Sequence, residues 1–214
     1  MGAKTWMLVY SKGNPSEILK GNLVLDREAT IALAKQLFSP EKMVALNDGD
    51  LSYTSPVDGE VVVGCFPGLI VVAAKEFGID YPSKLPLKFV EAFPDHTVYL
   101  HAMHSSVDWF AFAIWKDGKL QRSLSLSPDS GVLEDTGNRL PFEESYWAGD
   151  HPAIDPDEDD TEYPFVFHPL ELGEAALLSF FGYQLEGMMD ATQLEPETIK
   201  LMHFQRKNSW WRFF

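Results

Sequence analysis

The stretch between residues 96 and 126 holds the side chains best suited to chemistry. His101 and His104 stand in the motif HAMH, and histidine is both a general base and a frequent metal ligand near neutral pH. Residues three apart on a strand point to opposite faces of a sheet, so these two imidazoles are badly placed to chelate one ion. We therefore predict no metal site and no cofactor, and we expect each imidazole to be hydrogen-bonded within the sheet.

Asp108 and Arg122 are two further polar groups of interest in this stretch. The carboxylate of Asp108 lies across a short loop from His104, where it would orient the imidazole and raise its pKa. Stabilisation of the loop explains this pair as well, and we favour that explanation. Arg122 is predicted to point into an apolar face, where an unpaired charge is very costly. We favour a structural ion pair with a covering helix or with the loop at 134–135; the alternative is an anchor for an anionic ligand.

Two other groups of candidates lie outside this stretch. The long segment that follows Leu126 is predicted to be irregular, and it carries Trp147 and His151, which we consider ligand-binding candidates. The chain ends in WWRFF. An exposed aromatic patch of this kind marks a protein partner or a homodimer surface, whereas packing onto the chain's own domain would hide it. Both interpretations stay open for the tail residues Trp210, Trp211, Phe213 and Phe214.

The remaining motifs do not identify a reaction. Ser123 and Ser125 lack the spacing of a nucleophile elbow or triad, and Cys65 stands in an apolar strand that predicts an inert thiol. The acidic run DPDEDD lacks the spacing of an EF-hand loop. Our leading hypothesis is a non-catalytic binding or protein-interaction protein. The alternative is a hydrolase-like or anionic-ligand-binding enzyme, with its site between the 101–108 strand end and the 142–151 loop.

Composition limits the class of protein further. The chain has 214 residues, of which 45% are hydrophobic and 13% aromatic, and this suits a single folded domain. Its net charge of −15 argues against nucleic acid as a partner. The hydrophobic runs are too short to cross a membrane, and a single cysteine fits a reducing compartment. We therefore expect a soluble cytoplasmic protein that binds neither nucleic acid nor membrane.

Three consecutive antiparallel strands, at about 97–126, are predicted to position the candidate side chains. The Asp-Gly dipeptide at 117–118 suits the positive φ values of a type I′ hairpin turn. If it forms the turn, Trp115 faces Leu120 and Ala113 faces Arg122.

The two faces of this meander follow from the alternation of side chains along a strand. The first face suits close helix packing, because its alanines leave room for an approaching backbone. It carries Val98, Leu100, Ala102, His104, Trp109, Ala111, Ala113, Trp115, Leu120, Arg122, Leu124 and Leu126. The second carries Tyr99, His101, Met103, Phe110, Phe112, Ile114, Gln121, Ser123 and Ser125.

We predict an α+β fold from these elements. A mostly antiparallel sheet is built on the meander, with strands near 4–11 and 60–66 and helices near 26–38 and 169–181 packed on at least one face. Residues 1–214 would form one domain, with a solvated acidic excursion at about 150–163 and an aromatic tail at 208–214.

Several motifs resemble a bacterial family catalogued only as a domain of unknown function. They are MGAKT at the start, then HAMHSSVDWF, SLSLSPDSG, YWAGDHP and FHPLELGEAAL. The resemblance covers most of the chain and is densest from the meander to the helix that begins at Pro169. It implies a bacterial cytosolic protein and transfers no catalytic residues. We expect this member to differ from others in the acidic excursion and the tail.

Overall fold

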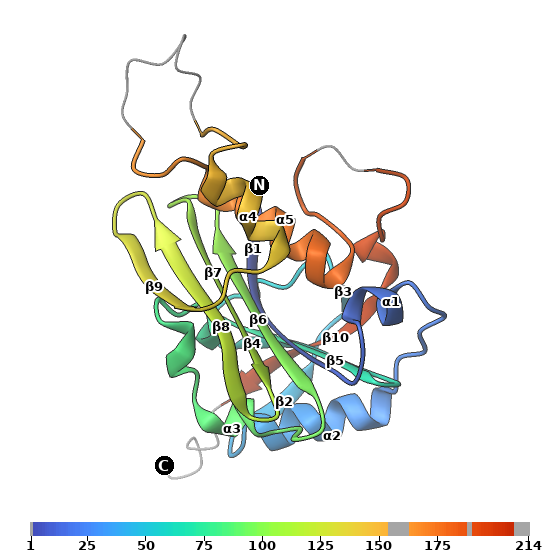
Figure 1. Cartoon of the computed structure of the whole chain (residues 1–214). Helices are drawn as coiled ribbons and strands as arrows, with labels where there is room; N and C mark the ends of the chain where they lie inside the picture. The colour runs from blue at the N-terminus through green and yellow to red at the C-terminus, as the bar shows by residue number, and fades with distance from the viewer. Residues whose placement is uncertain (1, 154–162, 188–189, 208–214) are drawn as a thin grey trace.

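The computed structural model describes residues 2–153, 163–187 and 190–207. Within these residues the strands form one 10-stranded sheet in the order β2-β10-β4-β5-β1-β6-β7-β8-β9, with β3 also beside β10, and all paired strands are antiparallel (Figure 1). The predicted α+β fold with a mostly antiparallel sheet is confirmed. The strands are β1 (Lys4–Ser11), β2 (Lys42–Ala45), β3 (Gly49–Asp50), β4 (Glu60–Phe66), β5 (Leu69–Ala74), β6 (Thr97–His104), β7 (Trp109–Lys116), β8 (Lys119–Ser127), β9 (Gly131–Gly137) and β10 (Lys200–Lys207).

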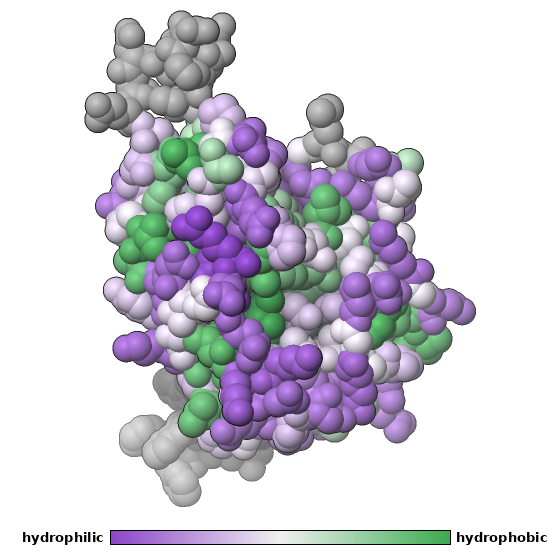
Figure 2. Space-filling model, viewed as in Figure 1, coloured by the Kyte–Doolittle hydropathy of each residue, from purple (hydrophilic) through white to green (hydrophobic). Residues whose placement is uncertain are grey.

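Helices lie on both faces of the sheet. The α-helices are α1 (Pro15–Leu19), α2 (Arg27–Leu37), α3 (Leu87–Val90), α4 (Pro141–Ala148) and α5 (Pro169–Phe181), and the short 3₁₀ helices are η1 (Lys75–Phe77), η2 (Pro82–Lys84) and η3 (Pro196–Thr198). We name the face covered by α1, α4 and α5 the α5 face, and the face covered by α2, α3 and η1 the α2 face. The α5 face, which carries α4 and α5 in Figure 1, has many hydrophilic residues on its outer surface, with separate hydrophobic areas between them (Figure 2).

The two longest helices begin where their capping signals predict. The Asp26 carboxylate accepts a hydrogen bond from the backbone N–H of Ala29, and this N-cap starts α2. Pro169 occupies the first turn of α5, and Gly182 ends that helix with a φ of 79°. None of the helices in the described residues is long and apolar enough to cross a bilayer.

The hairpin between β7 and β8 has the predicted turn but only part of the predicted register. Asp117 and Gly118 have φ values of 51° and 69°, and Trp115 lies opposite Leu120 as expected. A bulge then shifts the register by one residue, so that Arg122 lies opposite Ile114 instead of Ala113. A one-residue shift exchanges the two faces of a strand.

The bulge corrects the predicted faces of β8. Leu124 and Leu126 pack in the core of the α5 face, beside Phe110 and Phe112. Ser123 and Ser125 instead pair with Ala113 and Ala111, on the α2 face. The register between β6 and β7 is as predicted, including His104 opposite Trp109.

Of the two long helices, α2 packs in the same core cluster as the alanines of the meander, whereas α5 does not. α5 packs on β6 and β7 from the other face, against Phe110 and Met103. The close approach is made possible by a glycine in the helix: a Cβ at Gly173 would lie 3.1 Å from Phe110 and 3.2 Å from Met103.

The segment after β8 is more regular than predicted. It forms β9, which pairs with β8, and then α4, which packs near α5. Its numerous glycines and prolines stand at the boundaries of these elements: Gly131 and Gly137 are at the two ends of β9, Pro141 begins α4 and Gly149 caps it. Most of the predicted acidic excursion and the entire aromatic tail lie outside the described residues.

Candidate functional site

Arg122 is closed off from solvent inside an ion-pair network on the α5 face. Only 1% of the residue is exposed. Its Nε and Nη2 donate to the two carboxylate oxygens of Glu143, at 3.0 and 2.6 Å, and Nη1 donates to the carboxylate of Asp135. Glu143 comes from α4 and is fully buried, and Asp135 lies on β9. This is the structural ion pair that we favoured from the sequence, and it leaves the guanidinium out of reach of a ligand in solution.

His101 is a buried link between two strands and a helix. Its Nε2 lies 2.9 Å from the carbonyl oxygen of Gly173 and its Nδ1 lies 2.7 Å from the hydroxyl of Thr5. A carbonyl only accepts hydrogen bonds, so Nε2 carries the proton and Nδ1 accepts from the hydroxyl. Burial lowers the pKa of His101 to about 4, so the imidazole is neutral near pH 7.

His104 and Asp108 form no hydrogen bond with one another in the described part of the chain; each interacts with a different residue. The Nδ1 of His104 accepts a hydrogen bond from the backbone N–H of Ser106 at 3.2 Å, within the loop between β6 and β7. A carboxylate oxygen of Asp108 instead lies 3.6 Å from Nε2 of His168, the N-cap residue of α5. The His104 ring lies beside Trp6 on the α2 face, whereas Asp108 is directed to the start of α5.

Trp147 and His151 pack at the C-terminal end of α4 and just beyond it. The Trp147 ring meets Phe167 edge-on, and the guanidinium of Arg139 lies 4.2 Å from its centre. The His151 ring stacks on Tyr146 at 4.1 Å. The sequence candidates therefore do not meet in one site. Trp210, Trp211, Phe213 and Phe214 lie outside the described residues.

His151 lines a cleft of about 540 Å³ beside α5, together with Glu174. Glu174 is 7% exposed as a residue, and its carboxylate accepts hydrogen bonds from the backbone N–H groups of Leu185 and Glu186 at 2.8 and 3.2 Å. These bonds hold the segment that follows α5. Burial raises the pKa of Glu174 to about 7. Among the described residues, no three histidine, cysteine, aspartate or glutamate side chains are grouped so as to hold a metal ion.

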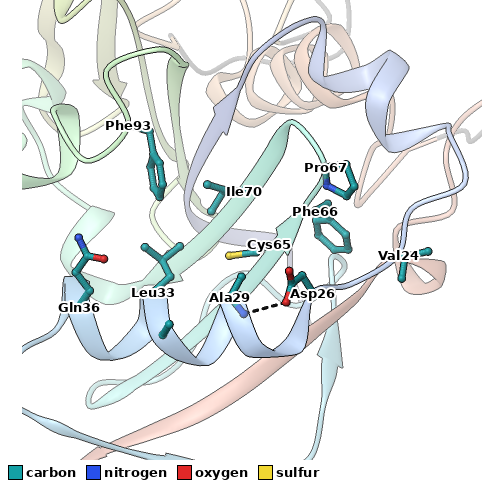
Figure 3. A pocket seen from close by; sticks show the side chains of 11 residues that line it. Val24, Asp26, Ala29, Leu33, Gln36, Cys65, Phe66, Pro67, Ile70 and Phe93 are labelled. Atoms are coloured by element: carbon teal, nitrogen blue, oxygen red, sulfur yellow. Dashed lines mark hydrogen bonds between the residues drawn. The ribbon is translucent and has the colours of Figure 1, made fainter.

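A larger and more apolar cavity lies on the α2 face (Figure 3). We call it the α2 groove; its volume is about 710 Å³. In Figure 3 successive turns of α2 form one wall and the end of the β4–β5 hairpin forms the floor. Phe93 lies on the opposite side. The lining residues are Val24, Asp26, Ala29, Ala32, Leu33, Gln36, Cys65, Phe66, Pro67, Ile70 and Phe93.

The groove exists because small side chains line the helix that covers the floor. Ala29 and Ala32 leave space where larger residues of α2 would fill it. The helix is held to β4 by Thr30, whose hydroxyl accepts from the backbone N–H of Cys65 at 3.0 Å and donates to the carbonyl of Asp26. The sequence analysis did not predict this site. The feature of the sequence that points to it is the pair of alanines on α2, which leaves space beside the helix.

One carboxylate oxygen of the groove is already engaged by the protein. Asp26 Oδ1 accepts from Ala29 N–H at 2.9 Å, shown as the dashed line in Figure 3. Burial raises the pKa of the Cys65 thiol, which keeps it protonated and weakly nucleophilic at neutral pH. The groove is thus suited to binding apolar molecules rather than to covalent catalysis.

A comparison with family models gives a match over most of the chain. The model of a family of unknown function (DUF6928) matches residues 5–204. This confirms the resemblance to an uncharacterised family that the motifs indicated. The searches of curated proteins and of solved structures gave no match to the chain.

Proposed function

The chain belongs to this family of unknown function, and we propose from its geometry that it is a non-catalytic protein that binds an elongated apolar small molecule in the α2 groove. The observation that carries the proposal is the groove itself: about 710 Å³ of open space with a mostly apolar lining. Binding sites for small molecules are typically concave, of this volume, and lined by apolar side chains with a few polar groups that fix orientation.

The positions of the polar groups suggest the shape of the ligand. Asp26 is next to the start of α2 and Gln36 is near its end. Ten residues of α-helix span about 15 Å. The apolar lining between them, including Leu33 and Ile70, favours an extended hydrocarbon chain with its polar end near one of these two side chains.

The neutral dye Nile red, whose fluorescence rises in apolar surroundings, tests the proposal. We expect saturable binding with a one-to-one stoichiometry, and competition by decanol. The variant Ala32→Trp places an indole in the groove and should weaken dye binding at least about tenfold, or 1.4 kcal/mol. The matched control is Lys35→Trp, which adds the same side chain to an exposed position of α2 outside the groove lining and should bind as the wild type does. Equal affinity in both variants would refute the α2 groove as the site.

The enzyme alternative has less support. It placed a site between the 101–108 strand end and the 142–151 loop, but His101 and Arg122 are both engaged in buried networks on the α5 face. We also propose a bacterial, cytoplasmic location, which the single buried Cys65 supports. A protein partner or homodimer contact through the WWRFF tail stays a prediction.

A further inference from the structure

A second cavity on the α2 face has a different lining. It lies where the β6–β7 and β8–β9 turns meet the segment after η1, and its volume is about 280 Å³. We call it the indole pocket, because two tryptophans form part of its wall. The lining residues are Trp6, Gly78, Asp80, His104, Val107, Trp109, Ser127, Asp129, Ser130 and Leu133.

The aromatic wall of the indole pocket is firmly packed. The rings of Trp6 and Trp109 are 6.1 Å apart and inclined at 44°, and the Trp6 ring lies 5.6 Å from that of His104. Trp6 rests closely on Gly78, where a Cβ would lie 2.7 Å from the ring. The Trp109 N–H donates to Ser125 Oγ at 3.2 Å, so the polar edge of this indole is occupied by the protein. Trp109 is 8% exposed and Trp6 is half-buried, so Trp6 offers the larger ring surface to the pocket.

The charge of the pocket is negative. Asp80 and Asp129 are exposed, and neither takes part in an ion pair with another described residue. Burial, together with the nearby charge of Lys4, lowers the pKa of His104, so the imidazole adds no positive charge at neutral pH. Lys4 itself lines the neighbouring cleft around Tyr53 rather than this pocket.

We propose that the indole pocket binds a small organic cation with an ammonium group. The two carboxylates supply the opposite charge, and indole is the aromatic side chain that attracts cations most strongly to its face. The volume of about 280 Å³ is at the lower end for ligand pockets and suits a ligand of a few carbon atoms. This site is separate from the α2 groove in both its residues and its ligand chemistry, so either proposal can fail without the other.

The probe pair is choline and 3,3-dimethylbutanol, which have nearly the same shape and differ in the positive charge. Binding is followed by the indole N–H signals in ¹H–¹⁵N NMR spectra of the full chain, at constant ionic strength. We expect choline to shift the Trp6 and Trp109 signals saturably, and the uncharged alcohol to bind at least tenfold more weakly. Equal binding of the two compounds, or equal shifts with glucose, would overturn the assignment to a cation.

Variants test the role of the carboxylates. Asp80→Asn combined with Asp129→Asn should weaken choline binding at least tenfold. The matched control, Glu17→Gln with Asp58→Asn, removes the same charge from exposed positions outside the pocket lining and should change binding less than twofold. Because all four side chains are exposed, we expect both variants to fold. Equal losses in the two variants would show a general charge effect and would refute the pocket.

Discussion

The two faces of the sheet differ in how deeply they bury charged side chains. On the α5 face, Arg122 and His101 are buried and satisfied by partners from α4, α5, β1 and β9. On the α2 face the buried polar side chains are small hydroxyls such as Ser123 and Ser125, and the charged cluster of Arg206 with Glu41 and Glu76 lies at the edge of an apolar core. The α2 groove and the indole pocket open on this face. The difference teaches that the buried ionisable groups Arg122 and His101 join helices to the sheet, whereas the space of the α2 groove arises where the side chains of the covering helix are small.

The covering helices account for this difference. α5 is a 13-residue helix with Leu172, Leu177 and Phe181 buried against the strands. α2 has 11 residues and presents Ala29 and Ala32 at the groove. Where helices cover the sheet closely, every enclosed charge must be neutralised, because an unpaired buried charge is very costly. A face covered by small residues is left with concave apolar surface.

The largest expected effect comes from breaking the network on the α5 face. Glu143→Gln removes the charge that faces Arg122 and should lower the free energy of unfolding by about 3–5 kcal/mol, because the buried guanidinium loses its main partner. Urea unfolding followed by circular dichroism measures this loss. The matched control is Glu144→Gln, an exposed neighbour on α4 that should change stability by less than about 0.5 kcal/mol. Similar stability of the two variants would contradict a structural role for the Arg122 network.

A smaller effect should appear in the pH dependence of stability. Two titratable groups beside α5 change the free energy of unfolding in opposite directions as the pH changes. The pKa of His101 is lowered from 6.5 to about 4, so its contribution to the free energy of unfolding decreases as the pH falls through that window. The pKa of Glu174 is raised from 4.5 to about 7, so its contribution to the free energy of unfolding decreases as the pH rises through that window. The two contributions therefore partly cancel in the wild-type protein between about pH 4.5 and 6.5.

Removing one group at a time should separate them. When the pH is lowered from 7 to 5, the free energy of unfolding of Glu174→Gln should fall more than that of the wild type, because only the His101 contribution is left. His101→Gln should show the reverse. We expect each difference to be on the order of 1–2 kcal/mol, since one pKa unit corresponds to about 1.4 kcal/mol. The measurement is urea unfolding at both pH values, and parallel pH profiles for all three proteins would refute the assignment.

How far the sequence predicts the molecule depends on whether a signal is local. The Asp-Gly turn, the Asp26 cap and the start of α5 at Pro169 are local, and the structure has each of them. The bulge at Gln121 has no such local signal, and it places Arg122 on the face opposite to the predicted one.

The candidate site was harder to predict for the same reason. Chemistry-bearing residues attract attention in a sequence, but Arg122 and His101 are occupied by partners brought together from distant segments. The α2 groove is a space enclosed by α2, the β4–β5 hairpin and Phe93, which are separated in the chain. Residue spacing reports positions along an element and does not report where two elements fail to fill the volume between them.

The smallest expected effect lies on the α2 face, at the start of the groove wall. Asp26→Ala removes the side chain that accepts from Ala29 N–H, and loss of such a cap typically costs about 1 kcal/mol. Asp26→Asn keeps an accepting oxygen and should stay within a few tenths of a kcal/mol of the wild type. Urea unfolding compares the two variants. Because the α2 face is held mainly by apolar packing, the loss in Asp26→Ala should remain well below that in Glu143→Gln; a loss of equal size would mean that polar groups support both faces alike.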